Sequence, residues 1–555
     1  MSNENQENQN KNQDKHDYKH DEHSHNKRYN ILIGGKAGQG INELANIIAA
    51  SLVNAGFYVF NYRDYQSLIT GGHNFNVVTF SQQPLYSNDE HYADIFIALD
   101  KNSYYIHKDK FDSNTIIATN TKELDANIHN LIFIDTSAFG KASNMVFAGF
   151  VLKILGLDKS FLIQEIDRKF KDKPIYEKDI EAANFGYEKD YGINLNLKAT
   201  EKKGSIYSGS EAIAKGAIDA GVEIYFGYPM TPSTPVLTLL ALEQKNNPNL
   251  KVFSPENEIA VIQASAGASF AGKRVMTGTS GGGFDLMSET LSMIGCMELP
   301  LVIHLAQRTG PSSGVPTYTA QSDLNVALYA GHGDFNRIVI APGDAKEAYE
   351  KTIEAFYLAE KLNTPVILLT DKHLVESQYT QTITKPAIVI PKRDIKLGKE
   401  IIKRNSYEHD INWNTTEDYL VIKESATRRV ELRNKIYDLC TQFKMFEHYG
   451  NPDAPNLLIS FGSTKGAVLD ALKSLPDFRY IHVSYVMPLN KDIIKEIVRS
   501  ENVFVIEGNS TGQFADYIQK QFALPIPQKN RILRYDSLPF TPKYIIDEVK
   551  KRLSS

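Results

Sequence analysis

"YPMTPSTP", residues 228–235, directly follows the apolar run "VEIYFG" at 222–227, and this junction decides how the middle of the chain folds. Proline locks φ and cannot donate a hydrogen bond to a sheet ladder, so the strand predicted over the apolar run must end here. Three hydroxyl side chains, those of Thr231, Ser233 and Thr234, lie between the prolines. Ligands bind beyond the carboxyl ends of strands in open α/β sheets. We therefore expect this stiff loop to line a ligand site.

The surrounding sequence alternates between short apolar runs and helical stretches. "RVMTGTS", "LPLVIHLAQ", "RIVIAPG" and "TPVILLTD" follow the junction in this manner. Such alternation predicts a mostly parallel sheet with helices on both faces. Ahead of the junction, Ser208 and Glu211 have the spacing of a capping box, and Gly221 is placed to end the helix that they begin.

Length and composition exclude several classes of protein. A chain of 555 residues is too long for one hydrophobic core. The net charge of −5 gives no basic footprint for nucleic acid. Two cysteines, Cys296 and Cys440, are too few for a disulfide framework or for the four thiolates of an iron–sulfur cluster. The apolar runs are short and no secretory signal is recognisable, which predicts a cytoplasmic protein with no membrane partner.

Composition and periodicity divide the chain into several units of the α/β class, built on doubly wound, mostly parallel sheets. The predicted divisions are a disordered polar tail at 1–28, an α/β domain at 29–190, a linker at 191–204, a second α/β domain at 205–385, a polar connecting segment at 386–450 and a third α/β domain at 451–555.

Two glycine-rich segments in the first domain allow more than one interpretation. "GGKAGQG" at 34–40 has the order G-x-x-G-x-G, which differs from the dinucleotide-binding order G-x-G-x-x-G. It is either a tight strand-to-helix turn or an anion site at a helix N-terminus. "SLITGGHN" at 67–74 contains His73, which is either structural or close to a substrate.

The second domain has two carboxylates at the start of a predicted helix, in "SPENEIAVIQASAGASFAG". Glu256 is adequately explained by the positive end of the helix dipole. Glu258 is followed at once by apolar residues, so it borders the buried face. A carboxyl group there could form a hydrogen bond to a heterocycle nitrogen, and the residues alone leave this open.

Two further loops follow strands of the same sheet. "TSGGGFDLMSE" at 279–289 places three glycines where a backbone could approach a ligand closely. "QRTGPSSGVPTYTAQSD" at 307–323 carries Arg308 and Thr317. Arginine flanked by hydroxyl groups suits a planar carboxylate. A "GDF" at 333–335 differs from the G-D-G motif that binds Mg²⁺ and a diphosphate, and we interpret it as coincidence.

Taken together, these motifs resemble the α subunit of 2-oxoacid:ferredoxin oxidoreductases. The resemblance rests on "YPMTPSTP", "PENEIA", "TSGGGFDLMSE", "RTGPSSGVPT" and "GHGDF". The segment with "GGKAGQGI" and "SLITGGHN" is similar to that family's γ domain, fused ahead of α, and "ISFGSTKGA" with "VIEGNSTGQFA" is similar to its transketolase C-terminal-like domain. The resemblance covers roughly residues 29–555.

The resemblance implies roles for individual residues. The domain at 205–385 would bind the pyrimidine ring of thiamine diphosphate, with Glu258 as the catalytic residue that favours its imino form. Thr231, Arg308 and Thr317 would bind the substrate. The cofactor-binding residues implied in addition to Glu258 are Tyr228, Pro229, Gly282 and Phe284.

The resemblance also implies an enzyme with a partner. A β subunit would carry Mg²⁺ with the diphosphate, and an iron–sulfur cluster, so that no metal is held by this chain. Coenzyme A would accept the acyl group and ferredoxin the electrons, in a heterodimer or a dimer of heterodimers. The identity of the 2-oxoacid stays open.

This sequence departs from the family pattern at three places: Thr70 stands where many γ domains have arginine, Met230 replaces isoleucine, and "SGGGF" replaces a glycine–proline–glycine. Two other functions compete with the catalytic one. A subunit built on these folds could be a non-catalytic scaffold, and the first domain could belong to an NAD-dependent dehydrogenase, although its glycine order argues against that.

Overall fold

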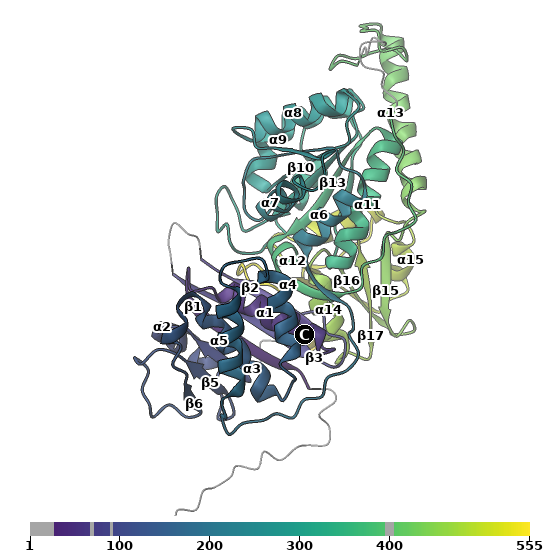
Figure 1. Ribbon diagram of the computed structural model, residues 1–555. Coiled ribbons are helices and arrows are strands. Elements are labelled where there is room, and N and C mark those ends of the chain that lie inside the picture. Colours follow the sequence, from purple (N-terminus) through teal and green to yellow (C-terminus); the bar gives the residue numbers. More distant parts are fainter. Residues whose placement is uncertain (1–26, 67–71, 89–92, 394–403, 555) are drawn as a thin grey trace, which may run out of the picture.

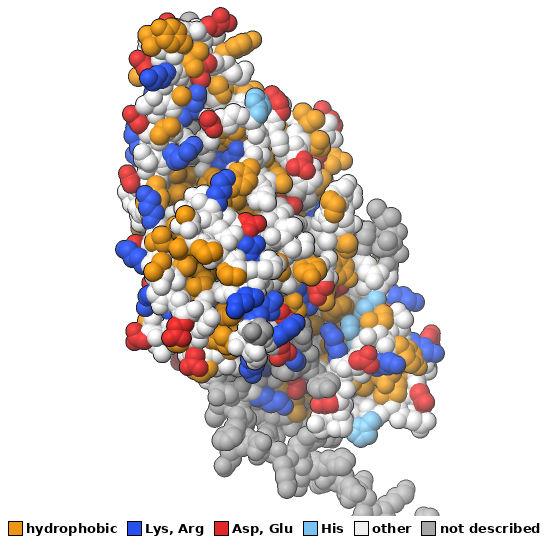
Figure 2. Space-filling view, turned by 180° about the vertical axis from the view of Figure 1, so that it is seen from behind, with side chains coloured by type: hydrophobic (Ala, Val, Ile, Leu, Met, Phe, Trp, Pro, Cys, Tyr) orange, Lys and Arg blue, Asp and Glu red, His pale blue; other side chains and the backbone are white. Residues whose placement is uncertain are grey.

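Apolar runs build three sheets, each covered by helices, in a computed structural model that describes residues 27–66, 72–88, 93–393 and 404–554. The first sheet lies in the lower part of Figure 1, the second in its upper part, and the third beside and behind them in green and yellow. The α/β class predicted from the sequence is confirmed. Basic, acidic and apolar side chains intermingle over the face shown in Figure 2.

The first sheet has eight strands in the order β6-β5-β4-β1-β3-β2-β14-β7. Its strands are β1 (Tyr29–Lys36), β2 (Tyr58–Asp64), β3 (His73–Ser81), β4 (Ile95–Ala98), β5 (Ile116–Thr119), β6 (Leu131–Phe133), β7 (Ser205–Ser208) and β14 (Gln378–Gln381). The half from β6 to β1 is parallel and the half from β1 to β7 is antiparallel. The sheet is therefore mixed, because the short connection between β2 and β3 allows only antiparallel pairing.

Five α-helices belong to this unit: α1 (Ile41–Asn54), α2 (Lys101–His107), α3 (Ser143–Leu155), α4 (Ser160–Phe170) and α5 (Tyr176–Glu188). Of these, α1 and α2 pack against the sheet, α3 and α4 pack against α1, and α5 packs against α3 and α4. Within the described residues, one helical stretch, Ser137–Leu155, is long and apolar enough to cross a membrane. Its apolar window is 67% buried, and α3 contributes to the hydrophobic core of this unit.

The second sheet has seven strands in the order β18-β12-β13-β11-β10-β8-β9. They are β8 (Ile224–Gly227), β9 (Lys251–Phe253), β10 (Val275–Thr279), β11 (Leu301–Gln307), β12 (Ile338–Ile340), β13 (Pro365–Asp371) and β18 (Tyr485–Met487). All pairs are parallel except β12 with β18. The helices of this unit are α6 (Gly209–Asp219), α7 (Thr234–Glu243), α8 (Glu258–Phe270), α9 (Gly281–Cys296), α10 (Leu324–Tyr329), α11 (Ala345–Leu362) and α12 (Lys372–Glu376).

Local signals in the sequence explain the start of this unit. The capping box predicted at α6 is present, because Ser208 accepts from the backbone of Glu211 and Glu211 bonds back to the backbone of Ser208. Gly221 adopts φ 76°, the left-handed conformation that ends a helix. These two ends orient α6, which packs against α11.

The third sheet has the order β15-β17-β16-β19-β20. Its strands are β15 (Phe446–Gly450), β16 (Asn456–Phe461), β17 (Phe478–Val483), β19 (Asn502–Glu507) and β20 (Arg531–Leu533), and its helices are α14 (Thr464–Leu472), α15 (Ile493–Val498), α16 (Gln513–Phe522) and α17 (Pro542–Leu553). Ahead of it, α13 (Tyr419–Cys440) runs along the side of the molecule and projects beyond it at the top of Figure 1.

A buried ion cluster joins the second and third units. Lys465 Nζ lies 2.7 Å from Asp344 Oδ2 and 2.6 Å from Glu347 Oε1. His482 Nε2 lies 2.9 Å from Glu347 Oε2. The neighbouring cations hold the pKa of Glu347 well below its usual range, although burial opposes this shift. The two units are thus fixed to each other by groups that are shielded from solvent.

Candidate active site

Loops at the carboxyl ends of neighbouring strands meet at one edge of the second sheet. β8 and β11 both pair with β10 in parallel, so the segments that follow these three strands emerge side by side. They are the "YPMTPSTP" loop, the N-terminus of α9 and the loop that begins at Arg308. α8, which starts at Glu258, lies against α9 in the upper part of Figure 1. The sequence therefore places the predicted site residues on converging elements.

Arg308 connects two of these loops. Its Nη1 donates to the backbone carbonyl of Thr231 at 2.8 Å. Burial lowers the pKa of the guanidinium, while the nearby carboxyl groups of Asp323 and Glu258 act to raise it. The hydroxyl of Ser233 donates to the Met230 carbonyl at 2.8 Å, so that side chain shapes the turn. Arg308 and Thr231 are thus brought together as the sequence analysis expected, although the contact uses the backbone of Thr231.

Glu258 is the first residue of α8 and its side chain is buried. The helix is capped by Asn257, whose side chain accepts from the backbone N–H of Ala260 at 2.9 Å, so Glu258 does not serve as the cap. Its Oε1 is buried and has no hydrogen-bond partner among the described residues. A Cβ atom added at Gly283 would lie 2.5 Å from that oxygen. By contrast, Glu256 is exposed and precedes the N-cap residue Asn257.

A carboxylate desolvated without a hydrogen bond is costly, so such an oxygen needs a donor from elsewhere. This geometry fits the thiamine diphosphate expected from the sequence, because the partner of an aminopyrimidine ring nitrogen must be a carboxyl oxygen that nothing else occupies. Gly283 keeps the approach to the oxygen open.

Asp323 is a site residue that the sequence analysis did not single out. Its carboxylate lies at the N-terminus of α9, where a Cβ atom added at Gly281 would come within 2.4 Å of Asp323 Oδ2. Burial, together with the negative charge of Asp285, raises its pKa to about 6, and Arg308 acts in the opposite direction. Asp323 is the last residue of the quoted stretch "QRTGPSSGVPTYTAQSD", but no spacing rule distinguishes it there from a surface aspartate.

The third unit holds Asp323 in place through the preceding residues. Gln321 donates its backbone N–H to the Gly508 carbonyl at 2.7 Å and its Nε2 to the Phe461 carbonyl at 3.0 Å. Asn509 Nδ2 donates to the Gln321 carbonyl at 3.0 Å. These partners come from "ISFGSTKGA" and "VIEGNSTGQFA", so those motifs act by fixing a loop of the second unit.

The remaining predicted site residues differ in how deeply they are buried. Thr317 is buried within the Arg308 loop, and no hydrogen bond joins its side chain to Arg308 among the described residues. Phe284, in the first turn of α9, is fully buried. Tyr228, Pro229 and Gly282 are exposed at the edge of the site. The predicted pocket is therefore open on one side.

The first glycine segment, at 34–40, forms a tight turn, whereas residues 67–71 of the second segment lie outside the described residues. Gly38 and Gly40 both have positive φ, and Gly40 directly precedes α1. His73 on β3 lies with its Nε2 2.7 Å from the Nε2 of His107. Burial lowers the pKa of both rings, that of His107 to about 3. Thr70 lies outside the described residues, and within the described part of the chain no cluster of three metal-ligating side chains occurs.

The chain matches protein-family models in its first two units. A model described as "Pyruvate ferredoxin/flavodoxin oxidoreductase" matches residues 30–189. A second, described as "Pyruvate flavodoxin/ferredoxin oxidoreductase, thiamine diP-bdg", matches residues 215–435. The second match contains every site loop described above.

Relatives and a solved structure agree with these matches. The "2-oxoacid:ferredoxin oxidoreductase subunit alpha" of Sulfolobus sp is 28% identical, with 95% of this chain and 96% of that protein covered. The "2-oxoglutarate synthase subunit KorA" of Methanocaldococcus jannaschii is 32% identical over 54% of this chain and 87% of its own length. The 2-oxoglutarate:ferredoxin oxidoreductase from Magnetococcus marinus, solved with 2-oxoglutarate, coenzyme A and succinyl-CoA bound, superposes with a TM-score of 0.84 at 27% identity and covers 95% of this chain and 100% of that one.

The family models match the first two units, and the Sulfolobus relative and the solved structure each cover 95% of this chain. This chain belongs to the family of 2-oxoacid:ferredoxin oxidoreductase alpha subunits.

Proposed function

We propose that this chain is the catalytic alpha subunit of an enzyme that converts a 2-oxoacid and coenzyme A to an acyl-CoA and carbon dioxide. The electron pair released from the 2-oxoacid passes to ferredoxin through a β subunit that carries Mg²⁺ and an iron–sulfur cluster. The observation that carries the proposal is the buried Glu258 Oε1, which has no partner within the described residues and faces Gly283.

The residues of this chain would hold the pyrimidine end of thiamine diphosphate. Glu258 would accept a hydrogen bond or a proton at Oε1, and Gly283 would leave the space that this contact needs. Phe284, buried beside it, excludes water from that side. When bound, the cofactor supplies the electron sink that decarboxylation of a 2-oxoacid requires.

Arg308 would bind the carboxylate end of the substrate. One of its nitrogens is held by the Thr231 carbonyl, which orients the guanidinium before substrate arrives. The side chain is only half-buried, so its remaining N–H groups are available to an anion. The charge of Asp323 limits how strongly Arg308 attracts that anion once Asp323 is ionised.

A partner chain would close the open side of the site. Large apolar side chains are exposed around the site loops: Tyr228, Phe253, Ile259, Leu286 and Val315. Apolar surface of this kind surrounding a polar centre marks an interface with another protein. Its place around Glu258 and Arg308 supports a β subunit that completes the cofactor site, in a heterodimer or a dimer of heterodimers.

The proposal is tested on the complex purified from its native source. We expect a second chain to co-purify, together with an iron–sulfur absorbance that a 2-oxoacid bleaches in the presence of coenzyme A. Full turnover by this chain alone would contradict the need for a partner. A complex that binds coenzyme A without reducing ferredoxin would favour a non-catalytic scaffold.

A further inference from the structure

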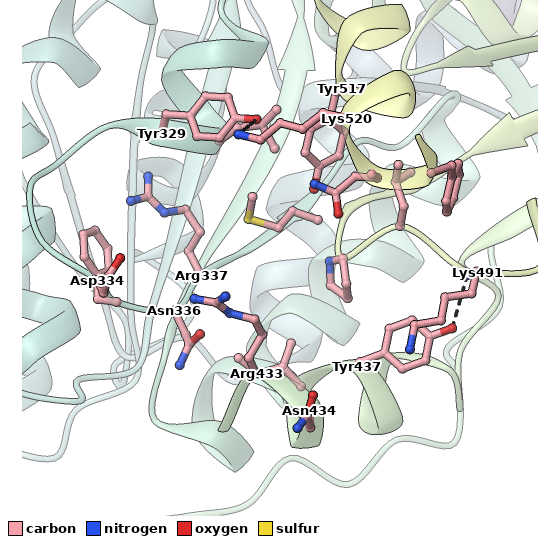
Figure 3. A pocket seen from close by; sticks show the side chains of 18 of the residues that line it. Tyr329, Asp334, Asn336, Arg337, Arg433, Asn434, Tyr437, Lys491, Tyr517 and Lys520 are labelled. Carbon is pink, nitrogen blue, oxygen red and sulfur yellow. Dashed lines mark hydrogen bonds between the residues drawn. The ribbon is translucent and has the colours of Figure 1, made fainter. Parts of the chain in front are cut away.

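A large cavity lies outside the candidate active site, where the second and third units meet α13. Its volume is about 1100 Å³. Its walls are α10, the segment at 331–337, one turn of α13, the loop after β18 and the end of α16 (Figure 3). The segment at 331–337 contains the "GDF" that the sequence analysis set aside. None of Thr231, Glu258, Arg308 and Asp323 lines this cavity.

Four cationic side chains line this basic cavity, against two carboxylates, those of Asp334 and Asp438. The cations are Arg337, Arg433, Lys491 and Lys520. They come from four different segments of the chain. In the part of the chain that the structure describes, no carboxylate lies within ion-pair distance of any of the four. The cavity therefore carries an excess of positive charge, and none of its four cations forms an ion pair within the described residues.

Each of these cations has only neutral partners or none. Arg337 is buried, donates to the carbonyls of Ala327 and Ala330, and lies 4.4 Å from the centre of the Phe335 ring. Burial lowers its pKa to about 10.

Both lysines of the cavity rest on tyrosine rings. Lys520 Nζ donates to the Tyr329 hydroxyl at 3.4 Å and lies 4.6 Å from the centre of that ring. Lys491 Nζ lies 4.6 Å from the centre of the Tyr437 ring. Figure 3 shows each lysine beside its tyrosine.

Arg433 is the most available of the four. It extends from α13 into the basic cavity in Figure 3, and its guanidinium has no hydrogen bond or ion pair among the described residues. An arginine held on a helix and without a partner offers five N–H donors in the fork that suits phosphate. The aromatic rings of Tyr329 and Tyr437 add flat surface on which a heterocycle can stack.

We propose that the basic cavity binds a nucleoside polyphosphate. A ligand must carry more than one negative charge to pair with cations from four segments. The tyrosine rings and the apolar wall suit the nucleobase of such a ligand. The volume lies slightly above the usual range for small-molecule sites, about 300–1,000 Å³, so a whole nucleotide fits. The phosphates would contact Arg433 and Lys520, while Arg337 supports the wall behind them. The same chemistry occurs in a free nucleotide and in the nucleotide part of coenzyme A.

The probe is ADP, titrated calorimetrically into the purified complex. We expect saturable binding that Arg433→Met and Lys520→Met each weaken by roughly tenfold, because each removes a charge-assisted contact to phosphate. The matched control is Lys435→Met. This change removes an exposed cation that lies on α13, two residues from Arg433, but does not line the cavity, so it should leave the affinity unchanged. Adenosine and pyrophosphate should each bind more weakly than ADP.

Titration in saturating coenzyme A separates the two sources of nucleotide. If ADP still binds, and binding still depends on Arg433, the ligand is a free nucleotide. If coenzyme A abolishes ADP binding and itself binds more weakly to Arg433→Met, the cavity receives the nucleotide part of coenzyme A. The proposal is overturned if ADP does not bind the complex, or if Arg433→Met, Lys520→Met and Lys435→Met all bind it as the unaltered protein does.

Discussion

The carboxylate of Glu258 lies directly against Gly283, such that a Cβ atom at Gly283 would come within 2.5 Å of Glu258 Oε1 and 2.1 Å of Thr279 Oγ1. One residue earlier in α9, a Cβ atom at Gly282 would have no neighbour closer than 3.8 Å. The run of glycines in "SGGGF" therefore contains two positions that the packing requires, Gly281 beside Asp323 and Gly283 beside Glu258, and one that it does not, Gly282.

Gly283→Ala should destabilise the complex and weaken thiamine diphosphate binding, because the methyl group forces the buried carboxylate and Thr279 to shift. Overpacking of this kind costs about 1–3 kcal/mol. The measurement is the thermal unfolding midpoint with and without the cofactor. Gly282→Ala is the matched control and should leave the midpoint of the cofactor-free complex unchanged or slightly raised. Equal midpoints for the two variants would show that a Cβ atom at Gly283 does not clash with Glu258 and Thr279.

Arg308→Lys should raise the KM for the 2-oxoacid by roughly tenfold, because lysine cannot both hold the Thr231 carbonyl and grip a planar carboxylate. The change in kcat should be smaller, since the reacting carbon is not the group that Arg308 contacts. Steady-state kinetics with varied 2-oxoacid separates the two parameters. An unchanged KM would remove Arg308 from the substrate site.

Asp323 should give substrate binding a pH dependence near its pKa of about 6. Below that pH the carboxyl is neutral, and Arg308 attracts the substrate carboxylate fully. As the pH rises through 6, Asp323 ionises and competes for Arg308, so KM should rise between about pH 5 and pH 7. Asp323→Asn should flatten this profile at its low-pH value. A profile of the same shape in the variant would mean that another group titrates.

Lys465→Met should destabilise the junction of the second and third units by about 3–5 kcal/mol, because it leaves the carboxylates of Asp344 and Glu347 buried without their cation. The pKa of Glu347 lies well below its usual range, so the stability that its ionisation contributes is present at neutral pH and is lost only as the pH falls through that low value. Thermal unfolding at pH 7 tests this.

The control for this change is Lys495→Met. Lys495 pairs with Asp492 at 2.6 Å on the surface, and exposed pairs contribute little. Its removal should change stability by less than about 0.5 kcal/mol. If the two variants unfold alike, the buried cluster does not hold the units together.

Much of the second unit followed from local rules in the sequence. Prolines at 229, 232 and 235 stop β8 and place Thr231 at the sheet edge, and the spacing of Ser208 and Glu211 starts α6. Backbone chemistry of this kind acts over a few residues, so sequence alone reveals it. Glu258 was separable from Glu256 because apolar residues follow it directly.

Long-range pairing was not accessible in the same way. β7 and β14 bound the second unit in sequence, yet both join the first sheet, and β18 leaves the third unit to pair with β12. Strands of three or four residues carry too little pattern to state their partners. α13 also escaped notice, because its mostly exposed faces lack the apolar periodicity that marks a helix packed on a core.

The sequence identified the site residues whose role follows from their residue type, but not those whose role follows from contacts between distant parts of the chain. Arg308 and Thr231 were identified from their loops, and the structure joins them. Asp323 acquires its raised pKa only from burial and from the negative charge of Asp285, both of which tertiary structure creates. The basic cavity likewise draws its cations from four distant segments that no local motif connects.

The most direct test of the account is the rate of 2-oxoacid-dependent ferredoxin reduction by the complex with Glu258→Gln, compared with Glu256→Gln. The two carboxylates are only two residues apart at the start of α8, but Glu258 is buried and Glu256 is exposed. We expect Glu258→Gln to lower kcat by about 100-fold or more, as loss of a proton-transferring group does, and Glu256→Gln to leave it within about twofold. Equal rates for the two variants would contradict the assignment of Glu258 to the cofactor and, with it, the catalytic role of this chain.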